Sequence, residues 1–308
     1  ETVVHLIDSY YNEGMDLLDA VFKVLDRIEG SYALGIVCKD FPDTLIAARK
    51  DSPLVVGIGE GENFIASDMP AILNYTKNVY LLDDKEVAII KADSIEILND
   101  KKEPVKKEVF TYNWDIEAAE KNGYDHFMLK EIYEQPKVVK DNISSRFSDD
   151  GKSIKLDGIK LGKKELENIN RIYIVACGTA FYAGQVGKFL IERIARIPVN
   201  SEVASEFRYK DPLIDEHTLM IVVSQSGETA DTLAAMRLAQ SKGARVLGVV
   251  NAVGSSIARE ADDVLYTLAG PEIAVASTKA FSAQVVAMYL LTLHIAQELN
   301  KISPEEFA

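Results

Sequence analysis

The sequence predicts two domains in succession: an α+β domain with a largely antiparallel sheet, then a three-layer α/β domain with a parallel sheet. Three observations predict this order. Short strand-like segments follow one another closely after Gly30, and continuous apolar strands alternate with helices from Arg171 onward. The 308 residues, 47% of them hydrophobic, can also fill two cores. Closely spaced strands pair antiparallel, whereas strands separated by helices pair parallel.

The first part of the chain opens with two predicted helices. Apolar residues repeat at helical spacing from Thr2 onward, and Gly14 and Gly30 are the expected helix ends. The predicted strands that follow are 31–38, 44–49, 54–59, 64–67, 79–82, 87–91, 94–98 and 105–111. Phe41-Pro42-Asp43 is expected to form a turn between two of them. Gly57-Ile58-Gly59-Glu60-Gly61 predicts a hairpin turn rather than a dinucleotide loop, because a strand follows where that loop requires a helix.

A polar stretch at residues 112–122 carries the only tryptophan and predicts the domain boundary. A helix is expected over 125–135, and Pro136 is expected to open a second helix through about Ser145. The parallel sheet then begins. Its predicted strands are 171–176, 199–203, 219–223, 245–251 and 263–268, and its predicted helices are 181–197, 229–242, 255–261 and 278–299.

Small polar residues gather where two of these strands end and where the last helix begins. The clusters are Cys177-Gly178-Thr179, Ser224-Gln225-Ser226-Gly227-Glu228-Thr229 and Ala276-Ser277-Thr278-Lys279. Ligands of parallel α/β sheets bind beyond the carboxyl ends of the strands, so the clusters predict one binding site. The second cluster predicts a phosphate site, since hydroxyls, backbone N–H groups and a helix N-terminus meet there. The alternative is that Ser226 or Thr229 only caps the helix.

Composition excludes several classes of partner. A net charge of −14 argues against nucleic acid or an anionic membrane surface as the main partner. No apolar run of about 20 residues and no signal-peptide pattern is found, so a cytoplasmic protein is expected. Two cysteines and four scattered histidines predict no disulfide framework, metal site or cofactor. Cys177 alone is more typical of a packed thiol than of a nucleophile.

Seven stretches distributed over most of the chain carry a family resemblance. They are Ser52-Pro53-Leu54-Val55-Val56-Gly57, Gly61-Glu62-Asn63-Phe64-Ile65-Ala66-Ser67-Asp68, Lys130-Glu131-Ile132-Tyr133-Glu134-Gln135-Pro136, Ala176-Cys177-Gly178-Thr179, Ala204-Ser205-Glu206-Phe207-Arg208-Tyr209, Ser224 to Leu233, and Val275-Ala276-Ser277-Thr278-Lys279-Ala280-Phe281. In these stretches the sequence resembles the glutamine–fructose-6-phosphate aminotransferase (isomerising) family, also called glucosamine-6-phosphate synthases.

The resemblance implies a fragment of a larger enzyme. Residues 1–111 would be the C-terminal part of a glutaminase domain of the N-terminal-nucleophile hydrolase class, 112–122 a linker, and 123–308 the first sugar-isomerase (SIS) domain. The family's catalytic residues would lie before and after this chain, so none is assigned here and the chain alone is expected to be inactive. The full-length protein would convert fructose 6-phosphate and glutamine to glucosamine 6-phosphate and glutamate, the first step of hexosamine synthesis. A homodimer is expected from the family.

Site residues follow from the resemblance by motif. Those expected to hold the phosphate of fructose 6-phosphate or glucosamine 6-phosphate are Ser224, Gln225, Ser226 and Thr229. Those expected to line the sugar are Cys177, Gly178, Thr179, Val275, Ala276 and Ser277. Ala180 stands where some relatives carry a phosphate-contacting serine. Lys279 could lend charge to the phosphate or face solvent, and both interpretations stay open.

Two other classes of function are weighed against this one. A non-catalytic phosphosugar-sensing module would share Ser224 to Thr229 but would leave residues 1–111 unexplained. A nucleotide-dependent oxidoreductase would need a glycine spacing that residues 178–184 lack.

Overall fold

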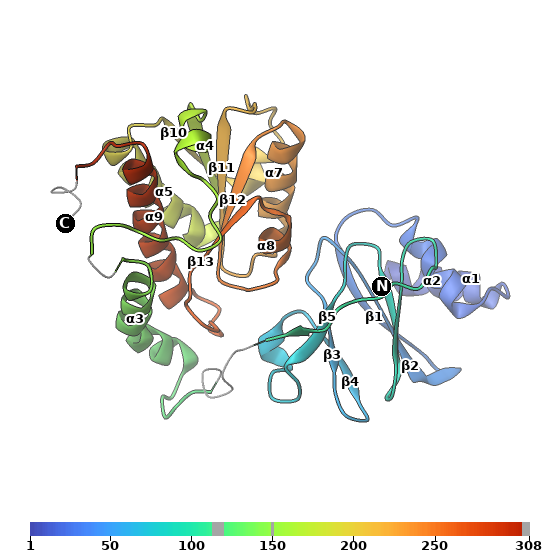
Figure 1. Cartoon of the computed structure of the whole chain (residues 1–308). Coiled ribbons are helices and arrows are strands. Elements are labelled where there is room, and N and C mark those ends of the chain that lie inside the picture. Colours follow the sequence, from blue (N-terminus) through green and yellow to red (C-terminus); the bar gives the residue numbers. More distant parts are fainter. Residues whose placement is uncertain (113–119, 149–150, 304–308) are drawn as a thin grey trace. The chain divides into compact units, whose positions relative to one another are not determined.

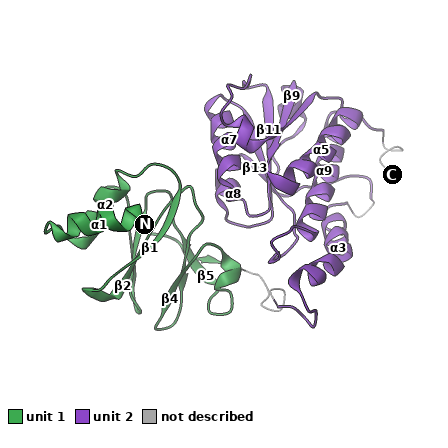
Figure 2. Cartoon of the chain, turned by 180° about the vertical axis from the view of Figure 1, so that it is seen from behind, with its two compact units in different colours: residues 1–113 green, residues 114–308 purple. Residues whose placement is uncertain are grey.

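The chain forms two compact units, Glu1–Asn113 and Trp114–Ala308 (Figure 1, Figure 2). The computed structural model describes residues 1–112, 120–148 and 151–303. Most of the linker predicted at 112–122 therefore lies outside the described residues.

The first unit contains two four-stranded sheets in which the paired strands run antiparallel, as predicted. Its helices are α1 (Thr2–Asn12), α2 (Leu17–Leu25) and the 3-10 turn η1 (Met69–Ala71). Its strands are β1 (Tyr32–Cys38), β2 (Phe41–Lys50), β3 (Val55–Ile58), β4 (Asn63–Ala66), β5 (Asn78–Leu81), β6 (Val87–Ile90), β7 (Ile95–Leu98) and β8 (Phe110–Thr111). The strand orders are β1-β2-β6-β7 and β4-β3-β5-β8.

Two apolar cores hold this unit in layers. Side chains of α1 and α2 pack on one face of the first sheet, where Val21 and Val24 meet Ile46 and Val87. The other face of that sheet packs on the second sheet through a core whose buried members are Ala47, Leu54, Val56, Leu82, Ala88, Ile90 and Ile97. Layers of helix, sheet and sheet result, because each sheet must bury its apolar face.

Local predictions in this unit are mostly confirmed. The glycine-rich segment after β3 is a hairpin turn, since Ile58 pairs with Asn63 in an antiparallel ladder. Phe41-Pro42-Asp43 is wrong as a turn: β2 already begins at Phe41, and the turn lies at Lys39 and Asp40. Of the predicted strand at 105–111, only β8 (Phe110–Thr111) is present.

The second unit is built on a five-stranded parallel sheet. Its strands are β9 (Arg171–Ala176), β10 (Val199–Val203), β11 (Thr218–Ser224), β12 (Arg245–Val250) and β13 (Asp263–Tyr266), in the order β10-β9-β11-β12-β13. The paired strands all run parallel, as predicted. Every residue of the central strand β11 is buried, as expected of a strand covered on both faces.

Helices cover both faces of this sheet and make three layers (Figure 1). The helices are α4 (Lys163–Glu167), α5 (Gly178–Ile194), α6 (Ala204–Phe207), α7 (Ala230–Ser241), α8 (Ser256–Glu260) and α9 (Lys279–Glu298). On one face α5 and α9 share a core with Ile172 and Ile174 of β9. On the other face α6, α7 and α8 share a core with Tyr173 and Val175. The short helices α4 and α6 have no counterpart among the helices predicted from the sequence.

A single long helix, α3 (Phe127–Ser144), stands where the sequence predicts two. Pro136 lies inside it, although proline lacks the N–H that would bond the carbonyl of Ile132. The side-chain amide of Gln135 donates to that carbonyl at 3.1 Å. This bond supplies a donor to the carbonyl that the proline leaves unpaired, and α3 continues through Pro136.

Among the described residues, one helix, α9, is long and apolar enough to cross a membrane. This differs from the expectation that no run reaches that length. An 18-residue stretch of the helix has a mean hydropathy of 1.3, yet 56% of that stretch is buried inside the protein. It packs beside α5, where the Met288 side chain lies against Gly187, so its apolar residues have a place in the core.

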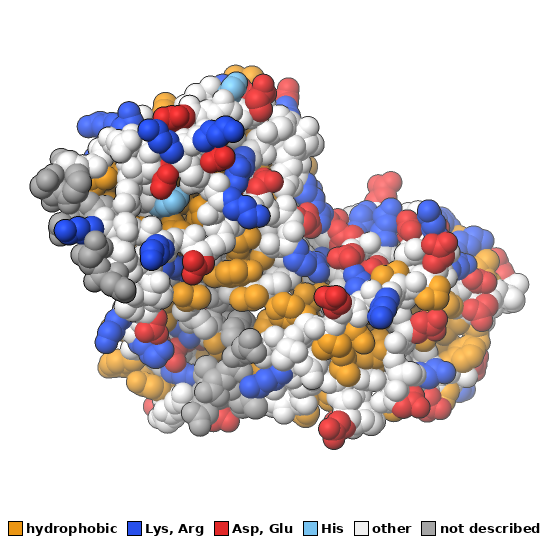
Figure 3. Space-filling model, viewed as in Figure 1, with side chains coloured by type: hydrophobic (Ala, Val, Ile, Leu, Met, Phe, Trp, Pro, Cys, Tyr) orange, Lys and Arg blue, Asp and Glu red, His pale blue; other side chains and the backbone are white. Residues whose placement is uncertain are grey.

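Charged side chains of both signs are interspersed over the face of the molecule seen in Figure 3. Some oppositely charged side chains form pairs, as Arg237 does with Glu260 at 2.8 Å and Arg208 with Asp231 at 2.8 Å. Pairs of this kind on a partly exposed surface contribute little to stability.

Candidate functional site

The polar clusters predicted from the sequence follow β9, β11 and β13. Because these strands run parallel, their carboxyl ends lie at one edge of the sheet. Strands β9 and β11 are neighbours, and the Thr232 hydroxyl of α7 lies 3.9 Å from Cys177 Sγ. The first two clusters therefore lie side by side.

Asn251 connects the second cluster to the loop after β13. Its N–H donates to the carbonyl of Gln225 at 3.2 Å. Its side-chain amide donates to the Gly270 carbonyl at 2.7 Å, and its Oδ1 accepts the N–H of Ala269 at 2.9 Å. Through its backbone and its side chain, one buried residue thus links the serine-rich loop to the residues before the third cluster.

The serine-rich loop is organised around the hydroxyl of Ser224. This oxygen accepts the N–H of Gly227 at 3.0 Å and lies 3.0 Å from the hydroxyl of Thr229. Thr229 occupies the N-cap position of α7, but its side chain makes no capping hydrogen bond. The Ser226 hydroxyl accepts the N–H of Glu228 at 3.2 Å and is exposed. Hydroxyls therefore gather at the helix start without serving as its cap.

Gly227 permits the tight course of this loop. Its φ is 67°, a left-handed value that non-glycine residues rarely adopt. A Cβ placed there would lie 2.0 Å from Ser255 Oγ. Glycine is required for both reasons, and the loop consequently lies close against the start of α8.

Acidic side chains next to the clusters are occupied by backbone donors. Glu228 accepts the N–H of Ser256 at 2.7 Å and its hydroxyl at 2.8 Å. Glu272 accepts the N–H groups of Thr278 and Ala280 at 2.9 and 3.1 Å, at the start of α9. Both carboxylates lie at helix N-termini, where the helix dipole favours negative charge.

Residues 275–277 form the part of the loop after β13 that precedes α9. Val275 and Ala276 are exposed, and Val275 is as accessible as in an extended chain, at 106%. The Ser277 hydroxyl donates to Glu272 at 3.0 Å. The backbone and side chains of Val275 and Ala276 are thus free to meet a ligand.

The cluster after β9 begins α5. Cys177 is the N-cap residue and Gly178 has a φ of 57°, while Gly178 and Thr179 are exposed. Ala180 is buried in the core under α5, at 7% exposure.

The solvent-facing interpretation of Lys279 is wrong. Its side chain is buried, and its Nζ lies 2.6 Å from Glu134 of α3. Glu134 also pairs with Lys130, at 3.5 Å. The N-termini of α5 and α7 add positive potential at the clusters.

Comparison with known proteins identifies this sheet. Residues 165–294 match the family model described as "SIS domain". The second unit contains a SIS domain. The match spans the strands β9 to β13 and all but the end of α9, but it leaves out α3.

The chain is also related to glutamine–fructose-6-phosphate aminotransferases (isomerising). It is 59% identical to the Clostridium tetani enzyme over 306 residues, which cover 99% of this chain and 50% of that protein. Identity to a Thermus thermophilus enzyme is 46%, again over 99% of this chain and 50% of the relative. The chain therefore spans about half the length of the curated relatives it matches.

A solved structure supports the fold. The C-terminal domain of glucosamine-fructose-6-phosphate aminotransferase from Francisella tularensis superposes with a TM-score of 0.58 and 43% sequence identity. The similarity covers 61% of this chain and 53% of that one.

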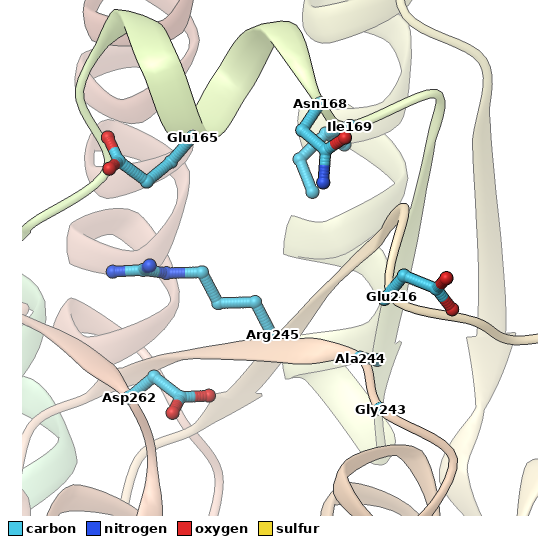
Figure 4. A pocket seen from close by; sticks show the side chains of 8 residues that line it. All are labelled: Glu165, Asn168, Ile169, Glu216, Gly243, Ala244, Arg245 and Asp262. Atoms are coloured by element: carbon cyan, nitrogen blue, oxygen red, sulfur yellow. The ribbon is translucent and has the colours of Figure 1, made fainter.

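A hollow at the other edge of the SIS domain is distinct from the clusters. It lies at the amino ends of β11 and β12 and is lined by Glu165, Asn168, Ile169, Glu216, Gly243, Ala244, Arg245 and Asp262 (Figure 4). The one arginine bonds Asp263 at 2.7 Å, which raises the pKa of its guanidinium. Three carboxylates remain in the lining, so the hollow is unsuited to a phosphate.

Sequence reasoning missed Asn251 and Glu272, which hold the clusters of the SIS domain together. Asn251 could have been found, because it directly follows the apolar strand β12 at the ligand-binding edge. Glu272 gives a weaker signal, since its role depends on the fold of the loop before α9.

Proposed function

We propose that the SIS domain binds a phosphosugar at the carboxyl edge of its sheet. Ser224, Gln225, Ser226 and Thr229 hold the phosphate. The observation that carries this is the meeting of the Ser224 and Thr229 hydroxyls, 3.0 Å apart, at the start of α7 without a capping bond. Hydroxyls at a helix N-terminus bind a phosphate dianion well.

The sugar lies between the two other clusters. Residues proposed to line it are Cys177, Gly178, Thr179, Val275, Ala276 and Ser277. The exposure of Gly178, Thr179, Val275 and Ala276 supports this assignment. Backbone groups of such residues can bond sugar hydroxyls without presenting a charge.

The chain belongs, in this proposal, to an enzyme that converts fructose 6-phosphate and glutamine to glucosamine 6-phosphate and glutamate in hexosamine synthesis. Similarity to the aminotransferases along 99% of the chain supports it. The chain supplies the phosphosugar half-site and no catalytic residue, so by itself it forms no glucosamine 6-phosphate. A non-catalytic sensing module would not account for the similarity of residues 1–111.

We further propose that residues 1–111 are the C-terminal part of a glutaminase domain, 112–122 a linker and 123–308 the first SIS domain. The layered packing of α1 and α2 on two antiparallel sheets is compatible with an N-terminal-nucleophile hydrolase remnant. Glutamine would bind through protein segments outside this chain. The protein is proposed to be a homodimer in the cytoplasm, without nucleic-acid or membrane partners.

Titration calorimetry of the chain with fructose 6-phosphate and with fructose tests the phosphosugar site. Binding that requires the phosphate is expected, because the proposed ligands are aimed at an anion. Equal affinity for the two sugars, or no binding of either, would count against the proposal.

A further inference from the structure

Helix α3 lies outside the residues matched to the SIS domain, yet it bonds the segment after β13 at several points. Asn142 donates to the carbonyl of Thr267 at 2.6 Å, and Arg146, just past the end of the helix, donates to that of Tyr266, the last residue of β13. Farther along, Glu131 accepts two backbone N–H groups of the same segment. The helix therefore contacts the start and the middle of the loop that ends at α9.

Glu131 makes the contact closest to the proposed sugar-lining residues. Its Oε1 accepts the N–H of Ile273 at 2.7 Å and that of Ala274 at 3.0 Å. The side chain is only 2% exposed. Hydrogen bonds to a buried carboxylate are charge-assisted and stronger than neutral ones. These two amides immediately precede Val275.

The loop is also fixed on both sides of these amides. Asn251 bonds Gly270 before them, and Glu272 bonds Thr278 after them. Between these points Val275 and Ala276 are exposed. Without the Glu131 carboxylate, the N–H groups of Ile273 and Ala274, which precede Val275, would lose their side-chain acceptor.

We propose that Glu131 is a positioning residue that sets the loop of Val275 and Ala276 for the sugar. This inference rests on the proposed function, since it requires that the loop meets the sugar. Glu131 does not itself touch the ligand. It acts through the Ile273 and Ala274 amides, and it fixes the loop before the ligand arrives, which reduces the ordering cost of binding.

The test compares substitutions of Glu131 in the whole 308-residue chain. Glu131→Ala removes both bonds and is expected to weaken fructose 6-phosphate binding about tenfold. Inorganic phosphate is held by the other loop, so its affinity is expected to change less than about twofold. Glu131→Gln retains an acceptor oxygen of the same reach and is expected to restore most of the sugar-phosphate affinity.

Gln135→Ala is the matched control on the same helix. Gln135 accepts the Ser282 hydroxyl of α9 at 2.6 Å and donates to the Ile132 carbonyl at 3.1 Å. Its loss therefore disturbs α3 itself and the contact of α3 with α9, but it removes no bond to the loop. Wild-type affinity for both probes is expected. Hydrogen exchange of the Ile273 and Ala274 amides is expected to accelerate in Glu131→Ala only. Glu131→Asp, with a shorter reach, replaces the alanine variant if that one does not fold.

Three outcomes would overturn the positioning role. These are equal losses for both probes in Glu131→Ala, the same loss in Gln135→Ala, or faster amide exchange with unchanged fructose 6-phosphate affinity. A different result would contradict the proposed function: the wild-type chain would bind neither fructose 6-phosphate nor inorganic phosphate. In that case Glu131 has no sugar loop to position, and the inference falls as well.

Discussion

Removing the single hydroxyl of Thr229 tests whether the serine-rich loop binds phosphate. We expect Thr229→Ala to weaken fructose 6-phosphate binding by about ten- to a hundredfold, since a hydrogen bond to a charged group contributes roughly 1.5 to 3 kcal/mol. The thermal midpoint should change little, because the side chain makes no capping bond. Calorimetry beside a thermal melt measures both quantities.

Non-phosphorylated fructose is the control ligand for Thr229→Ala. Its affinity should be unaffected if the hydroxyl contacts only the phosphate. A loss of about 1 kcal/mol in unfolding free energy with unchanged ligand affinity would instead indicate a cap.

Gly227 yields a prediction about stability. Gly227→Ala places a non-glycine residue at a φ of 67° and a Cβ 2.0 Å from Ser255 Oγ. A left-handed alanine costs about 1 to 2 kcal/mol, and the overlap adds to this, so a total loss above about 2 kcal/mol is expected. Denaturant unfolding of the second unit measures it.

Gly178 provides the matched comparison. Its φ is also positive, at 57°, but a Cβ there would meet nothing within 4 Å. Gly178→Ala should therefore lower the free energy of unfolding by about 1 to 2 kcal/mol, which is the strain of a left-handed alanine alone. Equal losses at both glycines would show that the Ser255 overlap relaxes without cost.

At the scale of elements, α3 is held to the rest of the second unit by buried polar side chains as well as by the apolar contact of Val138 with Ala280 and Ala283 of α9. Asn142 is fully buried, donates to Val138 and Thr267, and accepts from Arg146 at 2.7 Å. Burial also lowers the pKa of Arg146, whose guanidinium depends on these acceptors. Asn142→Ala is expected to destabilise the second unit by about 2 to 4 kcal/mol, because it leaves buried polar groups unpaired.

Lys137 lies on the same helix and serves as the control for Asn142. Its pair with Asp141, at 2.8 Å, is largely exposed. Lys137→Ala should change the unfolding free energy by less than about 0.5 kcal/mol. If both variants lowered the free energy of unfolding by the same amount, the buried hydrogen bonds of Asn142 would not be what makes α3 stabilise the second unit.

At the scale of the whole molecule, the proposed dimer has a defined candidate surface. Tyr182 and Phe189 of α5 are exposed at 63% and 60%, and Tyr289 of the adjacent α9 at 48%. Aromatic side chains are enriched in the cores of protein interfaces. Sedimentation of the chain at tens of micromolar, roughly the range for modest affinities, should show a dimer that Phe189→Glu dissociates. A monomer in both proteins would contradict this surface.

The sequence predicts much of this architecture because short-range patterns carry it. The buried run of β11 and the small polar residues behind it follow from local composition, and the structure places these strands side by side as expected. Pro136 was misinterpreted because the compensating donor is a neighbouring side chain, Gln135. Lys279 could not be placed, since its partner Glu134 lies 145 residues earlier in the chain. Side-chain contacts over such separations depend on the completed fold.

Helix α3 also links ligand binding to protein stability. The carboxylate of Glu131 bonds the loop that leads to Val275 and Ala276. The helix begins at Phe127, 13 residues after the second unit begins at Trp114. By thermodynamic linkage, a ligand that favours the bonded loop must favour the docked helix by the same free energy. An event that displaces α3 must weaken that ligand equally. Sugar occupancy and the docking of the first helix after the junction are, in this sense, coupled equilibria.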